Sequence, residues 1–174
     1  FGSRSELLPL LGLLDAGWTV ADVGTGTGHL THAIAPFVSR VIAVDASPAM
    51  IRTARARLGG MENVEIRRGE LESLPIEDGV LDAAFLVLVL PYLAEPALTI
   101  REAARALKSG GRLLITDLMP HERAEYRQTL GHLWQGFEAE QLLGWLGDAG
   151  LGDVRYAPAP MDAQASGTRL FTAV

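Results

Sequence analysis

The stretch Val20-Ala-Asp-Val-Gly-Thr-Gly-Thr-Gly28 decides the fold of this chain. Trp18 to Val23 has the composition of a short buried strand, three alternating glycines follow it, and the residues after Gly28 favour a helix. Glycine permits backbone angles that side chains forbid, and the start of a helix offers unpaired N–H groups to an anionic ligand. A tight strand–helix turn is the alternative, but three glycines exceed what such a turn needs. The stretch therefore predicts a ligand-binding loop between a strand and a helix.

An acidic residue completes this pattern at the end of the next expected strand, Arg40 to Asp45. Asp45 lies 17 residues after Gly28, and its carboxylate can accept hydrogen bonds from both hydroxyls of a ribose. A helix cap or a solvated strand end is the alternative role for this residue. Together with the glycines, Asp45 indicates a site for a nucleoside ligand.

The spacing of the glycines also bears on the kind of nucleoside. A dinucleotide-binding fingerprint has its third glycine five positions after the first, and this chain has His29 there. The observed spacing favours a cofactor with a carboxylate and an amine over one with a pyrophosphate. Asp22 agrees with this choice, because a carboxylate holds an ammonium group and repels a pyrophosphate.

Short apolar runs alternate with helical stretches along the rest of the chain. Further strands are expected at 63–67, 82–89, 112–116, 154–157 and 169–174, and helices at 4–16, 28–37, 48–58, 95–107 and 138–149. This alternation predicts an α/β fold with a doubly wound, mostly parallel sheet and helices on both faces. Ligands of such sheets bind beyond the carboxyl ends of the strands.

Composition limits the classes of partner. The 174 residues suit one domain, with a leading helix over 1–17. With 15 Lys and Arg against 21 Asp and Glu, the net charge of −6 disfavours a nucleic-acid or membrane surface. The longest apolar run, Ala83 to Pro91, is nine residues, and no signal peptide is recognised, so a cytoplasmic protein is expected. The chain begins with Phe1 and not with Met, which suggests a segment upstream.

Four blocks of the sequence resemble class I S-adenosylmethionine-dependent methyltransferases. Val20 to Leu30 resembles the loop that binds the methionine part, and Val41 to Met50 resembles the ribose-binding block. Arg68 to Pro75 is similar to the segment that contacts adenine, and Arg101 to Asp117 to the helix and fifth strand of the family. The resemblance implies a Rossmann-like sheet of seven strands whose last strand is antiparallel.

S-adenosyl-L-methionine as cofactor and S-adenosyl-L-homocysteine as product follow from this resemblance. Glu70 would accept from the adenine amino group, where the family usually has Asp, and Leu71 would lie beside the ring. A core position in its helix is the alternative for Met50. The residues expected at the cofactor are Asp22, Gly24, Thr25, Gly26, Gly28, Asp45, Ala46, Met50, Gly69, Glu70, Leu71, Val87 and Leu88.

A narrower resemblance covers the segment after the fifth strand. Asp117 to Tyr126 and Gly131 to Phe137 look like methyltransferase domains fused behind arsenical-repressor-type winged-helix regulators. This implies an N-terminal DNA-binding domain as partner, and a homodimer is the alternative expected from the sequence. Residues 119–137 are expected to form an insertion that covers the substrate.

Methyl transfer does not force one catalytic residue, so none is assigned. The reaction needs alignment and exclusion of water, and a general base only where the acceptor has a proton to lose. A solvated or capping role is the alternative for each histidine, and no metal site is expected. The candidates for acceptor contacts are His29, Tyr92, His121, Tyr126 and His132.

The sequence thus favours methyl transfer to a small-molecule acceptor. Cysteine is absent, so the chain lacks the soft ligands that would hold arsenic. A sensor of S-adenosylmethionine or its product, with little turnover, is one alternative. A nicotinamide-dependent oxidoreductase is another, against which the missing third glycine and the segment from Glu70 to Pro75 count.

Overall fold

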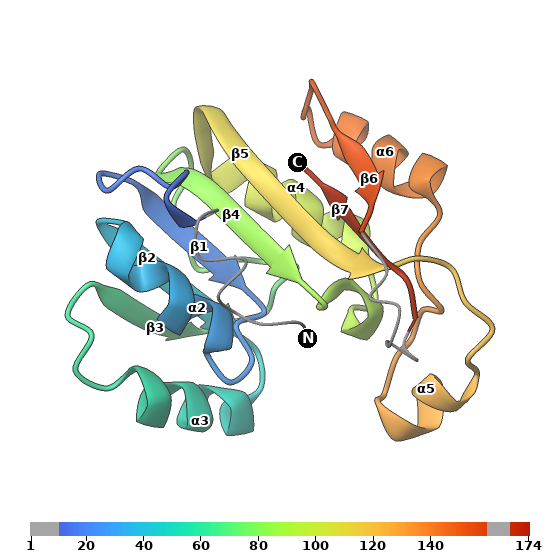
Figure 1. Cartoon of the computed structure of the whole chain (residues 1–174), viewed down its shortest axis with the longest axis horizontal. Coiled ribbons are helices and arrows are strands. Elements are labelled where there is room, and N and C mark those ends of the chain that lie inside the picture. Colours follow the sequence, from blue (N-terminus) through green and yellow to red (C-terminus); the bar gives the residue numbers. More distant parts are fainter. Residues whose placement is uncertain (1–10, 160–167) are drawn as a thin grey trace.

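One mixed sheet organises the part of the chain that the structure describes. A computed structural model describes residues 11–159 and 168–174 (Figure 1). Within these residues seven strands are hydrogen-bonded in the order β3-β2-β1-β4-β5-β7-β6. The first five strands pair in parallel, and β7 is antiparallel to both of its neighbours. The strands are β1 (Thr19–Val23), β2 (Arg40–Asp45), β3 (Val64–Arg68), β4 (Leu81–Val87), β5 (Leu107–Leu118), β6 (Tyr156–Pro158) and β7 (Leu170–Ala173).

The central strands are apolar on both faces because both faces are covered. Along β1 and β4 successive side chains point to opposite sides of the sheet. Val20 and Phe85 belong to one hydrophobic cluster, whereas Ala21 and Leu86 belong to the other. This burial explains why these strands are nearly continuous hydrophobic runs.

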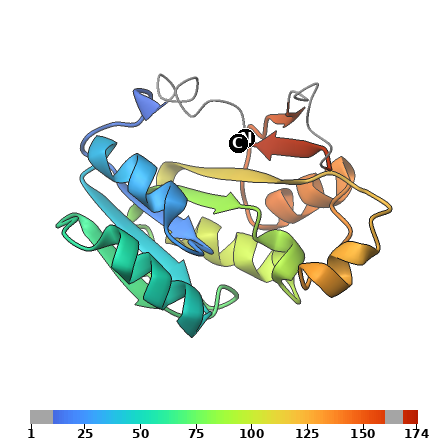
Figure 2. The ribbon, with the colours of Figure 1, turned by 60° about the horizontal axis from the view of Figure 1, so that its bottom comes forward.

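Helices pack on the two clusters from opposite sides. Ile34 of α2 (His29–Ile34) joins the cluster of Val20. Ile100 of α4 (Pro96–Ala106) and Leu142 of α6 (Ala139–Asp148) join the cluster of Ala21. Figures 1 and 2 show these helices on opposite sides of the sheet. None of the helices described is long and apolar enough to cross a membrane. The helical elements are α2 (His29–Ile34), η2 (Ala35–Phe37), α3 (Pro48–Leu58), η3 (Leu90–Tyr92), α4 (Pro96–Ala106), α5 (Glu125–Thr129) and α6 (Ala139–Asp148).

The order of the strands reverses between β1 and β4. From β1 the chain proceeds to β2 and β3 on one side, and from β4 to β5 on the other. The connections that leave the carboxyl ends of β1 and β4 therefore diverge, which opens a crevice at this edge. The doubly wound, mostly parallel sheet with an antiparallel last strand that the sequence predicted is confirmed.

Two central strands differ in length from the prediction. β5 begins at Leu107 and not at Arg112, because the segment with Gly110 forms an irregularity within the strand. Leu81 pairs with Leu107 before it and Ala83 with Arg112 after it. β4 ends at Val87, two residues early, because Leu88 adopts a φ of +54° that no extended strand has.

Several other expected boundaries also differ by one or a few residues. The predicted helix 28–37 is α2 followed by the 3-10 turn η2, because Pro36 cannot donate a helical hydrogen bond. The late strands are 156–158 and 170–173, both shorter than expected. Most of the predicted leading helix, 4–16, lies outside the described residues. From Leu11 onward a turn follows, and Leu11 and Leu14 pack against the cluster of Val20.

The segment 119–137, expected as a substrate cover, is tied to the connection after β4. The Leu133 amide donates to the Pro91 carbonyl at 2.7 Å, and the Trp134 indole donates to the Leu93 carbonyl at 2.9 Å. At its end Phe137 is fully buried in the core. Figures 1 and 2 show α5 of this segment beyond the carboxyl ends of β4 and β5.

Two glycines of this segment provide a matched test of its placement. Gly131 and Gly136 have φ values of +77° and +80°. A Cβ on Gly131 would meet nothing within 4 Å, but one on Gly136 would lie 2.1 Å from the Met119 carbonyl oxygen. We expect Gly131→Ala to lower the free energy of unfolding by about 1 kcal/mol, from the backbone conformation alone. Gly136→Ala should cost about 3 kcal/mol or more, because a clash adds to the same backbone term. Urea unfolding measures both, and equal losses would contradict the packing described.

Candidate functional site

The glycine loop after β1 has the left-handed backbone that only glycine adopts at low cost. Gly24, Gly26 and Gly28 have φ values of +79°, +54° and +80°. A Cβ on Gly24 would lie 2.3 Å from Val89 Cγ2, so that position must stay bare for packing. A Cβ on Gly26 would meet nothing within 4 Å, so the backbone there is open to the crevice.

Asp45 fixes this loop from the end of β2. Its Oδ2 accepts from the Gly26 amide and its Oδ1 from the Ser47 amide, both at 2.8 Å. The carboxylate thus joins the loop to the first turn of α3. Each carboxylate oxygen keeps a further lone pair, so the group can accept additional hydrogen bonds from a ligand.

Asp22 is a deeply buried carboxyl group at the end of β1. It is 2% exposed, and its Oδ2 accepts from the Thr31 hydroxyl at 2.6 Å, the Thr31 amide at 3.1 Å and the Thr25 hydroxyl at 2.8 Å. Burial raises the pKa of Asp22, and the hydrogen bonds from Thr31 and Thr25 partly oppose that rise. The residue therefore links the glycine loop to α2 while it still borders the cleft.

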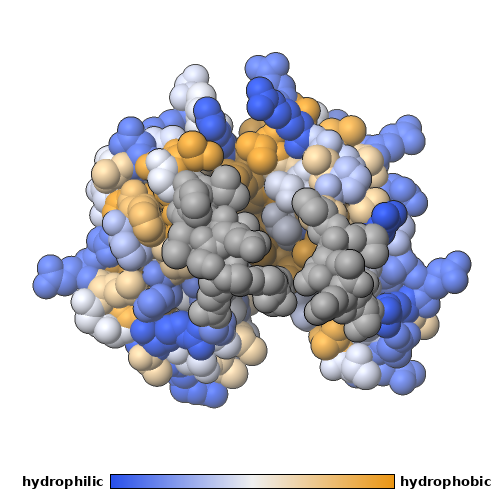
Figure 3. Space-filling view, in the orientation of Figure 1, coloured by the Kyte–Doolittle hydropathy of each residue, from blue (hydrophilic) through white to orange (hydrophobic). Residues whose placement is uncertain are grey.

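A cleft of about 740 Å³ lies at the switch point, between the glycine loop, α3 and the connection after β4. This volume is in the range of small-molecule and cofactor sites. In the space-filling view the surface is notched between the part with α2 and α3 and the part with α5 (Figure 3). The residues expected at the cofactor that line the cleft are Asp22, Gly24, Thr25, Gly26, Asp45, Ala46, Met50, Glu70, Leu71, Val87 and Leu88.

Gly28 and Gly69, also expected at the cofactor, do not line the cleft. A Cβ on Gly28 would lie 2.9 Å from Leu58 Cδ1, and one on Gly69 would lie 2.8 Å from Pro75. Both glycines thus permit close packing beside the cleft. Met50, by contrast, is 39% exposed and lines the cleft, so the alternative of a core position does not apply.

Other lining residues were not singled out from the sequence. Ser47 and Glu72 directly follow the predicted residues Ala46 and Leu71 in the sequence, so their neighbours could have pointed to them. Leu130 belongs to the segment 119–137 that was expected to cover the substrate, but it was not named as a site residue. The lining residues missed are Thr27, Leu30, Ser47, Glu72, Val89, Leu93 and Leu130.

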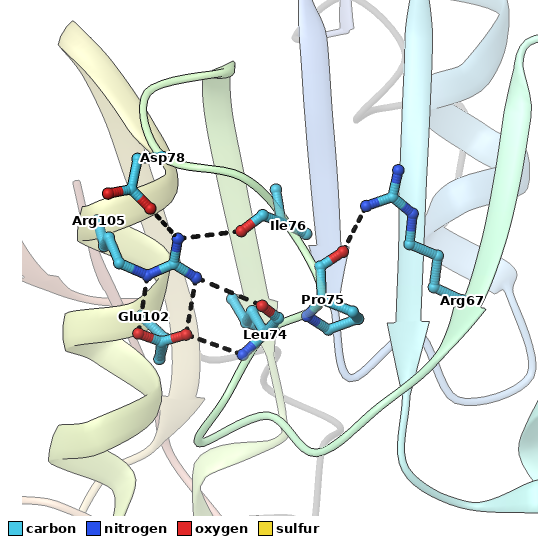
Figure 4. Close-up of polar contacts among 7 residues, drawn as sticks. All are labelled: Arg67, Leu74, Pro75, Ile76, Asp78, Glu102 and Arg105. Atoms are coloured by element: carbon cyan, nitrogen blue, oxygen red, sulfur yellow. Dashed lines mark hydrogen bonds and ion pairs between the residues drawn. The ribbon is translucent and has the colours of Figure 1, made fainter.

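The far wall of the cleft, residues 70–72, continues into a loop that Arg105 of α4 holds (Figure 4). The Arg105 guanidinium binds the Glu102 carboxylate at 2.8 and 2.9 Å and donates to the Ile76 carbonyl at 3.0 Å. It also pairs with Asp78. Glu102 in turn accepts from the Leu74 amide at 2.9 Å. This network fastens the loop to α4, and no pattern in the sequence predicted it.

A second cavity of about 220 Å³ adjoins the cleft. Leu88, Tyr92 and Leu130 line both spaces. Of the residues expected at the acceptor, His29 and Tyr92 line the cleft, and Tyr92, Tyr126 and His132 line the second cavity. The residues that line the second cavity are Leu88, Pro91, Tyr92, Asp117, Leu118, Tyr126, Leu130 and His132.

His121 lines neither space, and its ring lies 5.1 Å from that of Tyr126. Within residues 11–159 and 168–174 no three His, Asp or Glu side chains are grouped so that they could hold a metal ion. His121 and His132 therefore have no third ligand in the part of the chain described.

Asp117 at the end of β5 is fully buried beside the second cavity. Its carboxylate accepts from the amides of Val89 at 3.1 Å, Leu90 at 3.0 Å and Leu118 at 2.8 Å. Burial raises the pKa of Asp117 to about 6, against the three backbone donors that lower it. The side chain shapes the turn that carries Leu88 and η3.

The geometry defines a Rossmann-like domain whose candidate site lies at the switch point of the strand order. The comparisons with known proteins agree with this description. A candidate methyltransferase from Bacillus halodurans C-125 has a similar structure, with a TM-score of 0.76 and 29% identity over 91% of this chain and 74% of that one. The uncharacterised methyltransferase YcgJ of Bacillus subtilis is 34% identical over 66% of this chain and 46% of its own length. Demethylmenaquinone methyltransferase of Clavibacter sepedonicus is 34% identical over 59% of this chain and 42% of its own.

The sequence model of the methyltransferase domain family matches residues 21–115. The chain therefore belongs to this family, whose methyl donor is S-adenosylmethionine and whose product is S-adenosylhomocysteine. The chain spans under half the length of the two curated relatives named above.

Arg105→Ala tests the network behind the far wall. We expect it to lower the free energy of unfolding by about 1–3 kcal/mol, because several backbone and carboxylate acceptors lose their partner. Amide hydrogen exchange should quicken over residues 72–78. Arg101→Ala, an exposed position on the same helix, serves as the control and should change neither. Unchanged exchange in Arg105→Ala would contradict the anchoring role.

The raised pKa of Asp117 predicts a pH dependence of stability. The folded chain retains this proton up to about pH 6, whereas an unfolded aspartate loses it near pH 4. The folded state thus binds more protons between these values, and this contribution to stability falls as the pH rises through them.

Asp117→Asn removes the ionisable group. We expect the stability of the natural chain relative to this variant to fall by about 3 kcal/mol between pH 4 and pH 7. Urea unfolding of both proteins across this pH range measures the difference between their free energies of unfolding. The contributions of the other carboxylates are the same in both proteins and cancel in this difference. A difference independent of pH would refute the raised pKa.

Proposed function

We propose that the chain transfers a methyl group from S-adenosylmethionine to a small-molecule acceptor. The charge of the cleft carries this proposal. Four acidic residues line the cleft: the buried Asp22, and Asp45, Glu70 and Glu72. No Lys or Arg is among its described lining residues. This lining attracts the positively charged sulfonium and ammonium groups of the donor and repels the pyrophosphate of a nicotinamide cofactor.

The residues present fit the parts of that donor. The free lone pairs of Asp45 suit the ribose hydroxyls, and Met50 and Leu71 offer apolar walls for a purine. Glu70 supplies an acceptor for the adenine amino group. The open backbone at Gly26 allows the methionine part to lie against the loop. These assignments follow the resemblance and stay predictions for each residue.

When bound, S-adenosylmethionine supplies an activated methyl group on a positive sulfur. The task of the chain is then to position the acceptor, exclude water and take up a proton where the acceptor has one. Leu71, Val89 and Leu93 are buried members of the apolar lining, which keeps water away from the bound groups. The segment with Leu130 borders the same space and supports the predicted cover.

The alternative function is a sensor of S-adenosylmethionine or its product with little turnover. Methyl transfer explains every observation that would support such a sensor. The net charge of −6 supports a small-molecule acceptor over a nucleic acid. The expected link to a winged-helix regulator or a homodimer stays a prediction, as does the location in the cytoplasm.

Asp45→Ala tests the cofactor site. We expect the Kd for S-adenosylmethionine and S-adenosylhomocysteine to rise about 10- to 100-fold, because charge-assisted hydrogen bonds are lost. Isothermal titration with both compounds and with NAD measures this. Asp148→Ala, outside the cleft, is the control and should bind as the natural chain does. Thermal unfolding of Asp45→Ala separates lost binding from a loosened loop, and heat with NAD alone would refute the proposal.

A further inference from the structure

We propose that the second cavity is the acceptor site and that it takes a compact, uncharged molecule with a weakly acidic hydroxyl group, a phenol or an enol, whose proton passes to His132. This inference rests on the proposed methyl transfer and names the acceptor class for it. The position, size and polar groups of the cavity support it independently.

The second cavity is placed to present a ligand to the cleft. Leu88, Tyr92 and Leu130 form walls of both spaces, so a molecule in one lies next to a molecule in the other. Leu88 has a φ of +54°, a left-handed conformation that leucine rarely adopts. Its amide donates to the Thr116 carbonyl at 2.8 Å, which holds it there. Backbone strain of this kind gathers at functional sites.

The walls select a small and mostly apolar body. The volume of about 220 Å³ is below that of a site for a drug-sized ligand, so the acceptor is compact. Leu88, Pro91, Leu118 and Leu130 supply apolar surface, and the two tyrosines add ring faces and edges. An aromatic or enolic ring of few atoms suits these walls.

His132 is the polar group that lacks a partner. It is 6% exposed, and its Nδ1 is buried without a hydrogen bond to any described residue. The rings of Tyr92 and Tyr126 meet it nearly at right angles, with centroids at 4.7 and 5.6 Å, and fix its orientation. Burial lowers the pKa of His132, with a smaller contribution from His121, so the imidazole is neutral near pH 7 and able to accept a proton.

Two other acceptor classes are excluded, the first by its charge and the second by the proton that it holds. An anionic acceptor would be repelled by the buried carboxylate of Asp117, which already accepts three backbone N–H groups. A protonated amine has no lone pair for the methyl group, and a histidine of lowered pKa cannot remove its proton beforehand. A neutral hydroxyl keeps a lone pair on oxygen and can lose its proton during the transfer.

The transfer then balances without a further reactant. The hydroxyl oxygen forms a bond to the methyl carbon, the bond from that carbon to sulfur breaks, and its electron pair stays on sulfur. The hydroxyl proton passes to the imidazole of His132 and from there to solvent. The products are the methyl ether and S-adenosylhomocysteine.

Binding of simple probes tests the acceptor class. The full chain, saturated with S-adenosylhomocysteine, is titrated with phenol, benzoate and benzylammonium. We expect phenol to bind at least tenfold more tightly than either charged compound. The transfer itself is measured as tritium from methyl-labelled S-adenosylmethionine that appears in anisole when phenol is supplied.

Substitutions test His132. We expect His132→Gln to lower the rate of anisole formation 100-fold or more, the usual contribution of a general base, with the Kd for S-adenosylhomocysteine within twofold. Leu133→Ala changes the adjacent residue, which is 51% exposed and lines neither space, and should be neutral. If His132→Gln does not fold, Tyr126→Ala replaces it. This change removes a ring that lines the cavity and orients His132, and it should weaken phenol binding fivefold or more.

The outcomes separate the two proposals. If the natural chain does not bind S-adenosylhomocysteine, the proposed function itself is overturned. Intact binding of that compound with preference for benzoate or benzylammonium, or without anisole formation, would overturn the acceptor class alone. Equal activity of His132→Gln and Leu133→Ala would overturn the role of His132.

Discussion

The rest of the site depends on the hydrogen bonds that hold the glycine loop to the end of β2. The amides of Gly24 and Thr25 donate to the Val44 carbonyl, each at 2.9 Å, and the Gly26 amide donates to Asp45. These bonds need a left-handed backbone, which is why glycines occupy the positions. They bring the loop, the acid and the start of α3 together at the point where the strand order reverses. The crevice is therefore built by backbone geometry before any side chain contributes.

The two walls of the cleft are stabilised in different ways. Backbone hydrogen bonds and the buried carboxylate of Asp22 hold the side with the glycine loop, and both are shielded from solvent. The opposite wall follows a loop that a partly exposed guanidinium, Arg105, fastens to α4. Exposed ion pairs contribute less and are screened by salt. A rise in salt concentration should therefore loosen the wall with residues 70–72 more easily than the wall with the glycine loop.

Sequence reasoning found the parts of the site that local patterns encode. The glycine spacing, Asp45 and the apolar runs each carry a signal within a few residues, and they predicted the fold and the glycine-loop side of the cleft. The rest of the predicted lining, such as Met50, Glu70 and Leu71, followed from the family resemblance. Arg105 donates to carbonyl groups about 30 residues away in a loop whose sequence has no recognisable pattern. No local sequence pattern therefore predicted this interaction. β4 ends early because Leu88 has a positive φ. A leucine in the sequence does not predict such a backbone conformation. The contacts of His132 with the rings of Tyr92 and Tyr126 could be found only from the tertiary structure.

The four carboxylates of the cleft have a consequence for turnover. Loss of the methyl group turns a sulfonium into a neutral thioether, so the product carries one positive charge fewer than the donor. Under the proposed function, a negatively charged lining favours the positively charged donor over the neutral product. The same electrostatic field would then favour exchange of spent cofactor for fresh.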